Sequence, residues 1–237
     1  MGRKLDYVFC LPGDPSSAGQ SIQLHRMLNE LNAEGKTFVV IPQKATNIYQ
    51  VRNYCLSPPR ESGSDSQPFL GYDFRADQKP FETVVDDYER IIWIDSDNIV
   101  NSAVVKKLLS YDVDMVAAWY KLLLHGSDPQ RISAGFGTKP PFKCLLSSDL
   151  PMWPRTKDGL IEVDWSGFGL MIVKKGVTES LGYPWFYGEK MEWEEDGVKM
   201  ARVVEDDEGF CMRAKAKGFK IFIAPECKVA HEKKVAI

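Results

Sequence analysis

Two carboxylates separated by a single residue, Asp95 and Asp97, lie in the segment Asp95-Ser96-Asp97. Carboxylate oxygens bind Mg²⁺ and Mn²⁺ and leave coordination positions for phosphate oxygens. An isolated Asp-x-Asp is more often an exposed turn, because aspartate is common in turns. Here an apolar run at residues 90–94 precedes the segment, and a capped helix pattern follows it. We therefore predict a site for a divalent cation and a diphosphate at the end of a strand.

A histidine after the last apolar run, His231, is a candidate third ligand for this metal. Neutral imidazole is a frequent metal ligand, although a lone histidine is more often a surface or packed residue. The metal interpretation of His231 therefore depends on its combination with Asp95 and Asp97. Together the three side chains predict a site for Mn²⁺ or Mg²⁺.

An acidic run, Glu205-Asp206-Asp207-Glu208, opens the last helix pattern. Carboxylates at the start of a helix cap it and complement its dipole. Capping explains acidic residues at this place, but it does not require four in succession. Mutual repulsion raises the pKa of at least one of them, and a carboxylate with a raised pKa can act as a general base.

The segment Gly167-Phe168-Gly169 would let the backbone approach a bound sugar closely, or it marks a bulge at the start of a strand. Several aromatic side chains in the second half are candidates for stacking on sugar faces, with the core as the alternative location. They are Trp153, Trp165, Trp185 and Phe186.

Strand and helix patterns alternate in the first half of the chain, which predicts a parallel sheet of an α/β fold. Strands are expected at residues 7–11, 37–41, 90–94 and 115–118, and helices at 19–31, around Arg52, at 81–88 and from an N-cap at Ser102. Ligands of such sheets gather at the carboxyl ends of the strands, where Asp95 lies. The Gly-x-Gly-x-x-Gly pattern of dinucleotide sites is absent from the sequence, so no dinucleotide cofactor is expected.

The second half begins with a stretch rich in Pro, Gly and Ser at residues 121–164, which predicts an irregular region or a small antiparallel ribbon. A strand at 167–173, a helix at 207–217 and a strand at 220–224 ended by Pro225 follow. Residues 57–79 contain few apolar side chains and are expected to form a loop insertion. We predict one domain over 1–237, with a nucleotide-binding half at 1–120 and an acceptor-binding half at 121–237.

The composition excludes several other classes of protein. The net charge is −3 and the basic residues are scattered, which argues against a nucleic-acid partner. Five cysteines without a Cys-x-x-Cys pair favour neither a disulfide framework nor a zinc site, and they suggest a reducing compartment. No apolar run resembles a signal peptide or a membrane span, so we expect a soluble, cytoplasmic protein.

Five segments, read together, resemble the GT-A superfamily of glycosyltransferases, in particular the large inverting family with one Rossmann-like nucleotide-binding domain. They are Asp95-Ser96-Asp97 with its strand, Gly167-Phe168-Gly169, Pro184-Trp185-Phe186, Asp206-Asp207-Glu208-Gly209-Phe210-Cys211, and His231. The resemblance covers most of the chain. Agreement in order and spacing makes it more specific than any single motif.

This resemblance implies a GT-A type fold with a mostly parallel central sheet and a small antiparallel element in the C-terminal half. It implies metal-dependent transfer of a sugar from a nucleoside diphosphate sugar to a hydroxyl of a glycan or other acceptor. A UDP-sugar is favoured as the donor, with a GDP-sugar as the other option. It makes Asp97 and His231 metal ligands, Asp95 a contact of the metal or the ribose, and Asp207 the base beside Asp206.

Other positions are assigned to the donor or the acceptor by the same resemblance. The donor would contact Pro12, Gly13, Gln43, Arg52 and the Asp95-Ser96-Asp97 segment, and the acceptor side would include Trp165, Gly167, Phe168, Gly169 and Trp185. The sequence departs from the family pattern at two of the named positions. Asp206 stands where a glutamate is usual, and Gln43 where an acidic residue often contacts the nucleobase.

Two alternatives remain at this point. A haloacid-dehalogenase-like phosphatase would use Asp95 as its nucleophile, because its active-site loop also follows an apolar strand. A phosphatase would release phosphate from simple esters without any sugar nucleotide. A non-catalytic nucleotide-sugar-binding protein would bind the donor and metal without turnover.

Overall fold

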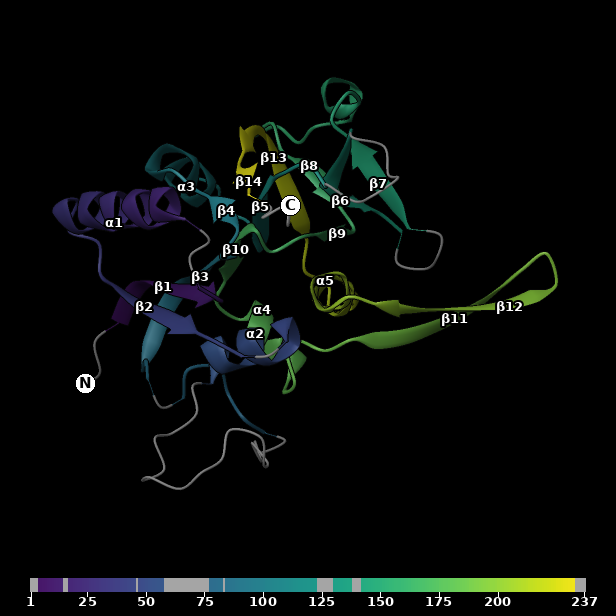
Figure 1. Ribbon diagram of the computed structural model, residues 1–237, viewed down its shortest axis with the longest axis horizontal. Helices are drawn as coiled ribbons and strands as arrows, with labels where there is room; N and C mark the ends of the chain where they lie inside the picture. The colour runs from purple at the N-terminus through teal and green to yellow at the C-terminus, as the bar shows by residue number, and fades with distance from the viewer. Residues whose placement is uncertain are drawn as a thin grey trace.

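The computed structural model (Figure 1) describes residues 4–14, 17–45, 47–57, 77–82, 84–122, 130–137 and 142–232. Within them, a seven-stranded sheet has the strand order β2-β1-β3-β10-β5-β13-β8. Its strands are β1 (Lys4–Pro12), β2 (Phe38–Gln43), β3 (Asp87–Ile94), β5 (Met115–Trp119), β8 (Ile161–Val163), β10 (Leu170–Lys174) and β13 (Ile221–Lys228). β8 and β10 run opposite to the other strands. The predicted α/β fold is confirmed, with a central sheet that is partly parallel, since three of its strand pairings are parallel and three are antiparallel.

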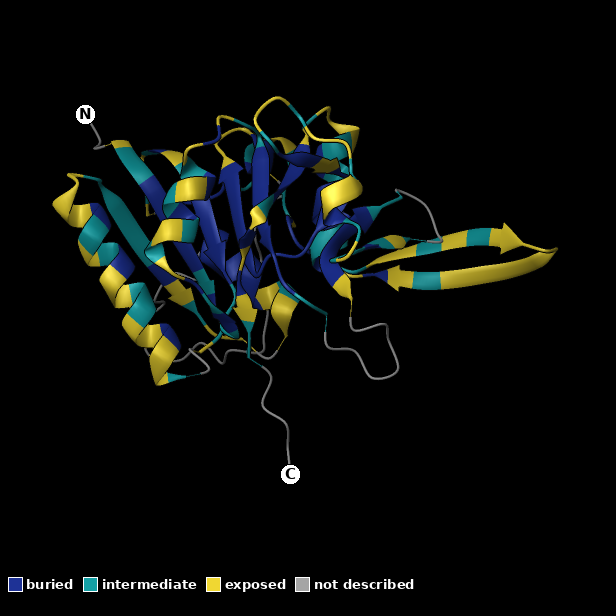
Figure 2. Cartoon of the chain, turned by 90° about the horizontal axis from the view of Figure 1, so that it is seen from above, coloured by how far each residue is buried: buried dark blue, intermediate teal, exposed yellow. Residues whose placement is uncertain are grey.

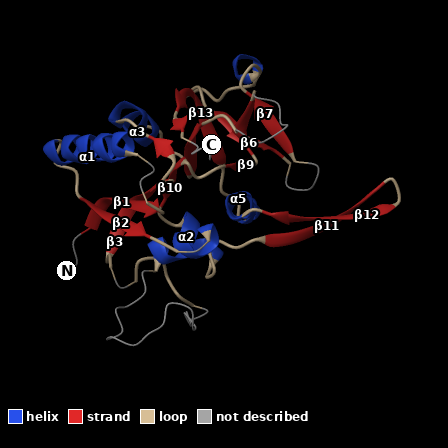
Figure 3. Ribbon diagram, viewed as in Figure 1, coloured by secondary structure: helices blue, strands red, loops and turns tan. Residues whose placement is uncertain are grey.

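Helices cover both faces of the sheet (Figure 1, Figure 3). They are α1 (Ala18–Ala33), α2 (Ile48–Leu56), α3 (Ser102–Leu109), α4 (Val177–Leu181) and α5 (Asp206–Ala216), with a short 3₁₀ turn at Leu150–Met152. α1 and α3 pack through Met27 and Leu108 on one face, whereas α2 and α5 pack through Cys55 and Phe210 on the other. None of the helices in the described ranges combines the length and apolar character needed to span a membrane.

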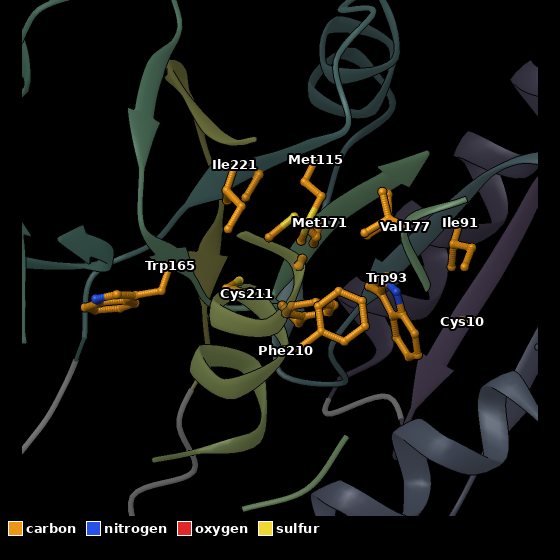
Figure 4. Packing of buried hydrophobic residues seen from close by; sticks show 14 of the residues in the cluster. Cys10, Ile91, Trp93, Met115, Trp165, Met171, Val177, Phe210, Cys211 and Ile221 are labelled. Carbon is orange, nitrogen blue, oxygen red and sulfur yellow. The ribbon is translucent and has the colours of Figure 1, made fainter. Parts of the chain in front are cut away.

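The strand β3, which leads to Asp95, is buried on both of its faces. Ile91, Ile92, Trp93 and Ile94 are at most 3% exposed. Figure 4 shows Trp93 in the cluster that also contains Phe210 of α5. Full burial of an apolar side chain of this size stabilises a fold by roughly 1.5–3 kcal/mol relative to exposure. The strand is therefore a firmly packed support for the segment that follows it.

Smaller sheets complete the second half of the chain. β6 (Arg131–Phe136), β7 (Lys143–Leu146) and β9 (Trp165–Ser166) form an antiparallel sheet, so the predicted small antiparallel element is confirmed. β14 (Ala230–His231) pairs with β4 (Asn98–Ile99). This pairing brings the end of the described chain back to the turn after β3.

A long hairpin extends from the body of the molecule (Figure 1). Its strands, β11 (Glu189–Glu195) and β12 (Val198–Val204), form a separate two-stranded sheet, and most of their side chains are exposed (Figure 2). Asp196 and Gly197 both have positive φ, 50° and 76°, as the two central residues of a type I′ turn require. The sequence prediction missed this hairpin, although Asp-Gly between two strand patterns is a strong hairpin signal.

Several predicted element boundaries are wrong. Residues 81–88 do not form a helix: Phe81 lies in a turn with φ 59°, and Asp87 already begins β3. Asn101, not Ser102, caps α3, because its side chain accepts from the Val104 N–H. The strand expected at 167–173 begins at residue 170, and β13 continues through Pro225 to Lys228. Most of the predicted loop at 57–79 lies outside the described residues.

Candidate functional site

The ends of β1, β2 and β3 bring together the residues predicted to contact a nucleotide. Pro12 of β1 pairs with Gln43 of β2, and the Gly13 N–H donates to the Gln43 carbonyl oxygen at 2.8 Å. Gly13 has φ +90°, and a methyl group on it would lie 2.7 Å from the Ser96 Oγ. Only glycine fits this close approach of two loops. Pro12, Gly13, Gln43 and Ser96 therefore meet at one edge of the sheet.

A small cavity of about 70 Å³ opens at this edge. It is lined mostly by apolar side chains from β1, α1 and the turn after β3, namely Leu11, Pro12, Gly13, Gln20, Leu24, Met27, Pro42, Ile94, Ser96, Asn98 and Val100. Gln20 is a functional candidate that the sequence did not indicate. Its side-chain amide donates to the Asp95 carbonyl oxygen at 3.0 Å and so links α1 to the Asp-Ser-Asp turn.

Arg52 lies between two carboxylates that are far apart in the sequence. Its Nη2 donates to both oxygens of Asp95, at 2.9 and 3.1 Å, and its Nη1 donates to Asp206 at 2.7 Å. The guanidinium also lies over the rings of Phe168 and Phe186, 5.3 and 5.7 Å from their centroids. Its side chain is only 4% exposed. In the described structure Arg52 joins the turn after β3 to the start of α5, instead of facing an open nucleotide site.

The two neighbouring carboxylates keep the Arg52 guanidinium protonated. Burial opposes the charge, but the negative charges of Asp95 and Asp206 outweigh burial and raise the pKa of Arg52 above its ordinary value. A guanidinium has the fork geometry needed to hold two carboxylates at once. Arg52 is therefore a permanently charged link between the predicted metal segment and the predicted base segment.

Asp97 and His231 form the other close pair of the site. His231 Nε2 lies 2.8 Å from Asp97 Oδ2, with the Asp97 side chain 42% exposed and the His231 side chain 11% exposed. His231 Nδ1 is buried and has no hydrogen-bond partner among the described atoms. Along the described part of the chain, no group of three His, Cys, Asp or Glu side chains is arranged to hold a metal ion.

A divalent cation fits Asp97 and His231 better than Asp95. A carboxylate beside an imidazole is a suitable donor pair, in which His231 Nε2 is the nitrogen that faces Asp97, and phosphate oxygens could supply further ligands. Both oxygens of Asp95 already accept hydrogen bonds from Arg52. The described geometry thus gives the two aspartates different partners, which agrees with the different roles that the resemblance implies for them.

Asp207 lies at the start of α5, next to Asp206. The side chain of Asp206 is 4% exposed and paired with Arg52, whereas Asp207 is partly exposed and its Oδ1 accepts from the Glu208 N–H at 2.7 Å. Burial, opposed by the charge of Arg52 and assisted by that of Asp206, raises the pKa of Asp207 to about 7. A carboxylate with this pKa is half ionised near neutral pH, as an efficient general base requires.

Three of the four aromatic side chains predicted to stack on sugars, Trp165, Trp185 and Phe186, lie in the core, whereas Trp153 is partly exposed and its ring centroid lies 4.6 Å from that of Phe136. Trp165, Phe168, Trp185 and Phe186 are at most 4% exposed, and Phe168 packs edge-on against Trp93 with their centroids 5.7 Å apart. These rings offer no face to a ligand, because the strands and α5 cover them. The apolar periodicity of the sequence could not separate a stacking platform from a core residue.

The strand order and the helices on both faces define an α/β fold of the GT-A type. The structure of GalNAc-T7 with UDP, GalNAc and Mn²⁺ has a TM-score of 0.53 and 10% identity, covering 98% of this chain and 44% of that chain. This similarity supports the fold.

Two further solved structures have lower TM-scores. The catalytic domain of Drosophila beta1,4galactosyltransferase 7 in complex with xylobiose has a TM-score of 0.47 and 11% identity, covering 97% of this chain and 71% of that chain. A197 from STIV has a TM-score of 0.49 and 12% identity, covering 98% and 97%. No protein-family model and no curated protein matches the sequence.

Proposed function

We propose that this protein transfers a sugar from a nucleoside diphosphate sugar to an acceptor hydroxyl, with the help of a divalent cation. The observation that carries the proposal is the pair of contacts made by Arg52, to Asp95 beside Asp97 and to Asp206 beside Asp207. Through these contacts a donor side and a base side share one edge of the sheet. A GT-A type fold is consistent with this chemistry, since the similar GalNAc-T7 structure contains UDP, GalNAc and Mn²⁺.

Each side chain has a defined task in this proposal. Asp97 and His231 would hold Mn²⁺ or Mg²⁺, which would neutralise the charge of the departing diphosphate. Asp207 accepts the proton of the acceptor hydroxyl while the new carbon–oxygen bond forms at the anomeric carbon and the bond to the diphosphate breaks. Gly13 and Ser96 line the donor, for which a UDP-sugar is our first choice, and residues 121–237 supply the acceptor side.

A panel of nucleotide sugars with and without Mn²⁺ tests the donor and the metal together. A ligand that binds only the folded state raises the melting temperature. We expect an increase for one nucleotide class, with UDP-sugars first, and a larger increase when Mn²⁺ is present. Differential scanning fluorimetry is the measurement.

The Asp97→Ala variant provides the matched comparison for this panel. It is expected to lose the Mn²⁺-dependent part of the shift and most of the donor affinity, because it removes a proposed ligand. An Asp149→Ala variant, at a partly exposed position beyond the site, should respond like the wild type. A wild-type protein that responds to no nucleotide sugar would contradict the proposed function.

The phosphatase alternative has less support from the geometry. A nucleophilic aspartate needs a free oxygen, and both oxygens of Asp95 accept from Arg52. Release of phosphate from a simple aryl phosphate ester, without a sugar nucleotide, would restore this alternative. Donor binding without transfer to any acceptor would instead support a non-catalytic binding protein.

A further inference from the structure

The glycines of the Gly167-Phe168-Gly169 segment leave space that the protein's own side chains fill. A methyl group on Gly167 would collide with the hydroxyl of Tyr120, and one on Gly169 would collide with the Tyr120 ring. The same methyl group on Gly169 would lie 2.8 Å from both amide atoms of Asn98. These glycines therefore allow Tyr120 and Asn98 to approach the backbone, whereas the sequence had suggested either a close approach of a bound sugar or a bulge.

Asn98 contacts both members of the Asp97–His231 pair. Its Nδ2 donates to Asp97 Oδ1 at 3.0 Å, while the other oxygen of that carboxylate faces His231. Its backbone pairs with His231 in the β4–β14 ladder. Asn98 is 1% exposed, so the surrounding structure fixes the orientation of its amide.

Tyr120 supports the same pair from the imidazole side. Its ring centroid lies 4.8 Å from that of His231, and the tyrosine is 8% exposed. The carboxylate of Asp97 is thus held by the amide of Asn98, and the ring of His231 is packed against Tyr120. Neither Asn98 nor Tyr120 belongs to the motif residues that the sequence indicated.

We propose that Asn98 and Tyr120 are positioning residues that hold Asp97 and His231 in a metal-binding geometry. The absence of a side chain at Gly169 leaves the space that Asn98 and Tyr120 occupy. This inference rests on the proposed function, because it assumes that the pair binds a cation. Groups that orient metal ligands contribute strongly to affinity, and their loss typically weakens metal binding by about 10- to 100-fold.

Titration of Mn²⁺ alone into the intact protein tests the inference without any transfer reaction. Isothermal calorimetry should show Mn²⁺ binding at least about 10-fold weaker for Asn98→Ala and for Gly169→Ala than for the wild type. Asn29→Ala and Gly19→Ala, both in α1, are matched controls that should bind like the wild type. Gly19 tolerates a methyl group because its nearest neighbour would be the Ser17 Oγ at 3.6 Å.

Substitutions of Tyr120 provide an independent test if Asn98→Ala or Gly169→Ala does not fold. Tyr120→Phe keeps the ring on His231 and should bind Mn²⁺ like the wild type, whereas Tyr120→Leu should bind it more weakly. In transfer assays, saturating Mn²⁺ should restore kcat to Asn98→Ala, which a general loss of structure would not permit.

The possible outcomes separate the two proposals. If the wild type binds Mn²⁺ and the folded Asn98→Ala and Tyr120→Leu variants bind it equally well, the positioning inference is wrong and the proposed function stands. If the wild type binds no Mn²⁺, the metal-dependent function is wrong and the positioning inference falls with it.

Discussion

Replacing Asp207 by asparagine is expected to abolish sugar transfer while leaving donor binding intact. The amide has nearly the shape of the carboxylate but cannot accept the proton of the acceptor hydroxyl. Loss of a general base typically lowers the rate by about 100- to 10,000-fold. Single-turnover transfer assays at saturating donor measure this loss, and the fluorimetric shift with donor and Mn²⁺ should remain at the wild-type value.

The pH dependence of the wild type provides a second measurement of the same assignment. Because Asp207 has a pKa of about 7, transfer should increase through neutral pH as the carboxylate ionises, and then reach a plateau. An Asp158→Asn variant in an exposed turn should keep the wild-type profile. Full transfer by Asp207→Asn would exclude this residue as the base and direct attention to Asp206.

Asp207→Asn is expected to stabilise the folded protein, although it abolishes transfer. The raised pKa means that folding disfavours the charge on Asp207, so the wild type loses stability as the pH rises from the ordinary value of 3.8 to about 7. One pKa unit corresponds to about 1.4 kcal/mol. With allowance for partial exposure, Asp207→Asn should be on the order of 2 kcal/mol more stable than the wild type at pH 8. The difference should vanish below pH 4 in urea unfolding experiments.

Replacing Arg52 by methionine is expected to cause the largest loss of stability of any single substitution in the site. It leaves the carboxylates of Asp95 and Asp206 close together without their shared cation, and the Asp206 side chain is 4% exposed. Removing one partner of a buried ion pair typically costs about 3–5 kcal/mol. Urea unfolding at pH 7 measures this change directly.

Two further variants show whether the cost arises from the unpaired carboxylates. Arg155→Met, at an exposed position, should change the free energy of unfolding by no more than about 0.5 kcal/mol. Adding Asp206→Asn to Arg52→Met should recover part of the loss, because it removes one of the stranded charges. An Arg52→Met protein as stable as Arg155→Met would contradict the linking role of Arg52.

The sequence predicted six of the seven strands of the central sheet; the seventh, β8, lies in the stretch at 121–164 that was expected to be irregular or a small antiparallel ribbon. Apolar runs such as residues 90–94 predicted β3, and the alternation with amphipathic stretches predicted the parallel pairing of β1 with β2 and β3 but not the antiparallel pairing of β10. Phe81 shows the limit of this reasoning, because its apolar neighbours imitate a helical period while its backbone adopts a turn with positive φ. The hairpin was missed because β11 consists mostly of charged residues, so its sequence lacks a clear alternation of apolar and polar side chains.

The sequence named candidate residues for the site, but it did not predict which of them contact each other. Pro12, Gly13, Gln43 and Ser96 meet at one edge of the sheet, as the strand order requires. The resemblance implied different roles for Asp95 and Asp97, but the contacts of Arg52 with Asp95 and Asp206 were not predicted, because sequence periodicity does not report contacts between distant residues. For the same reason the sequence could not indicate Asn98 or Tyr120.

The β11–β12 hairpin has a consequence for how the molecule opens. Its amide groups bond only to the opposite strand, whereas strands such as β3 lie between two neighbours in a packed core. A two-stranded hairpin is at best marginally stable by itself. Hydrogen exchange at residues 189–204 should therefore report local opening, with protection unaffected by Arg52→Met. Exchange at β1, β3 and β10 should instead follow the free energy of global unfolding. The hairpin and the central sheet should therefore open with different free energies.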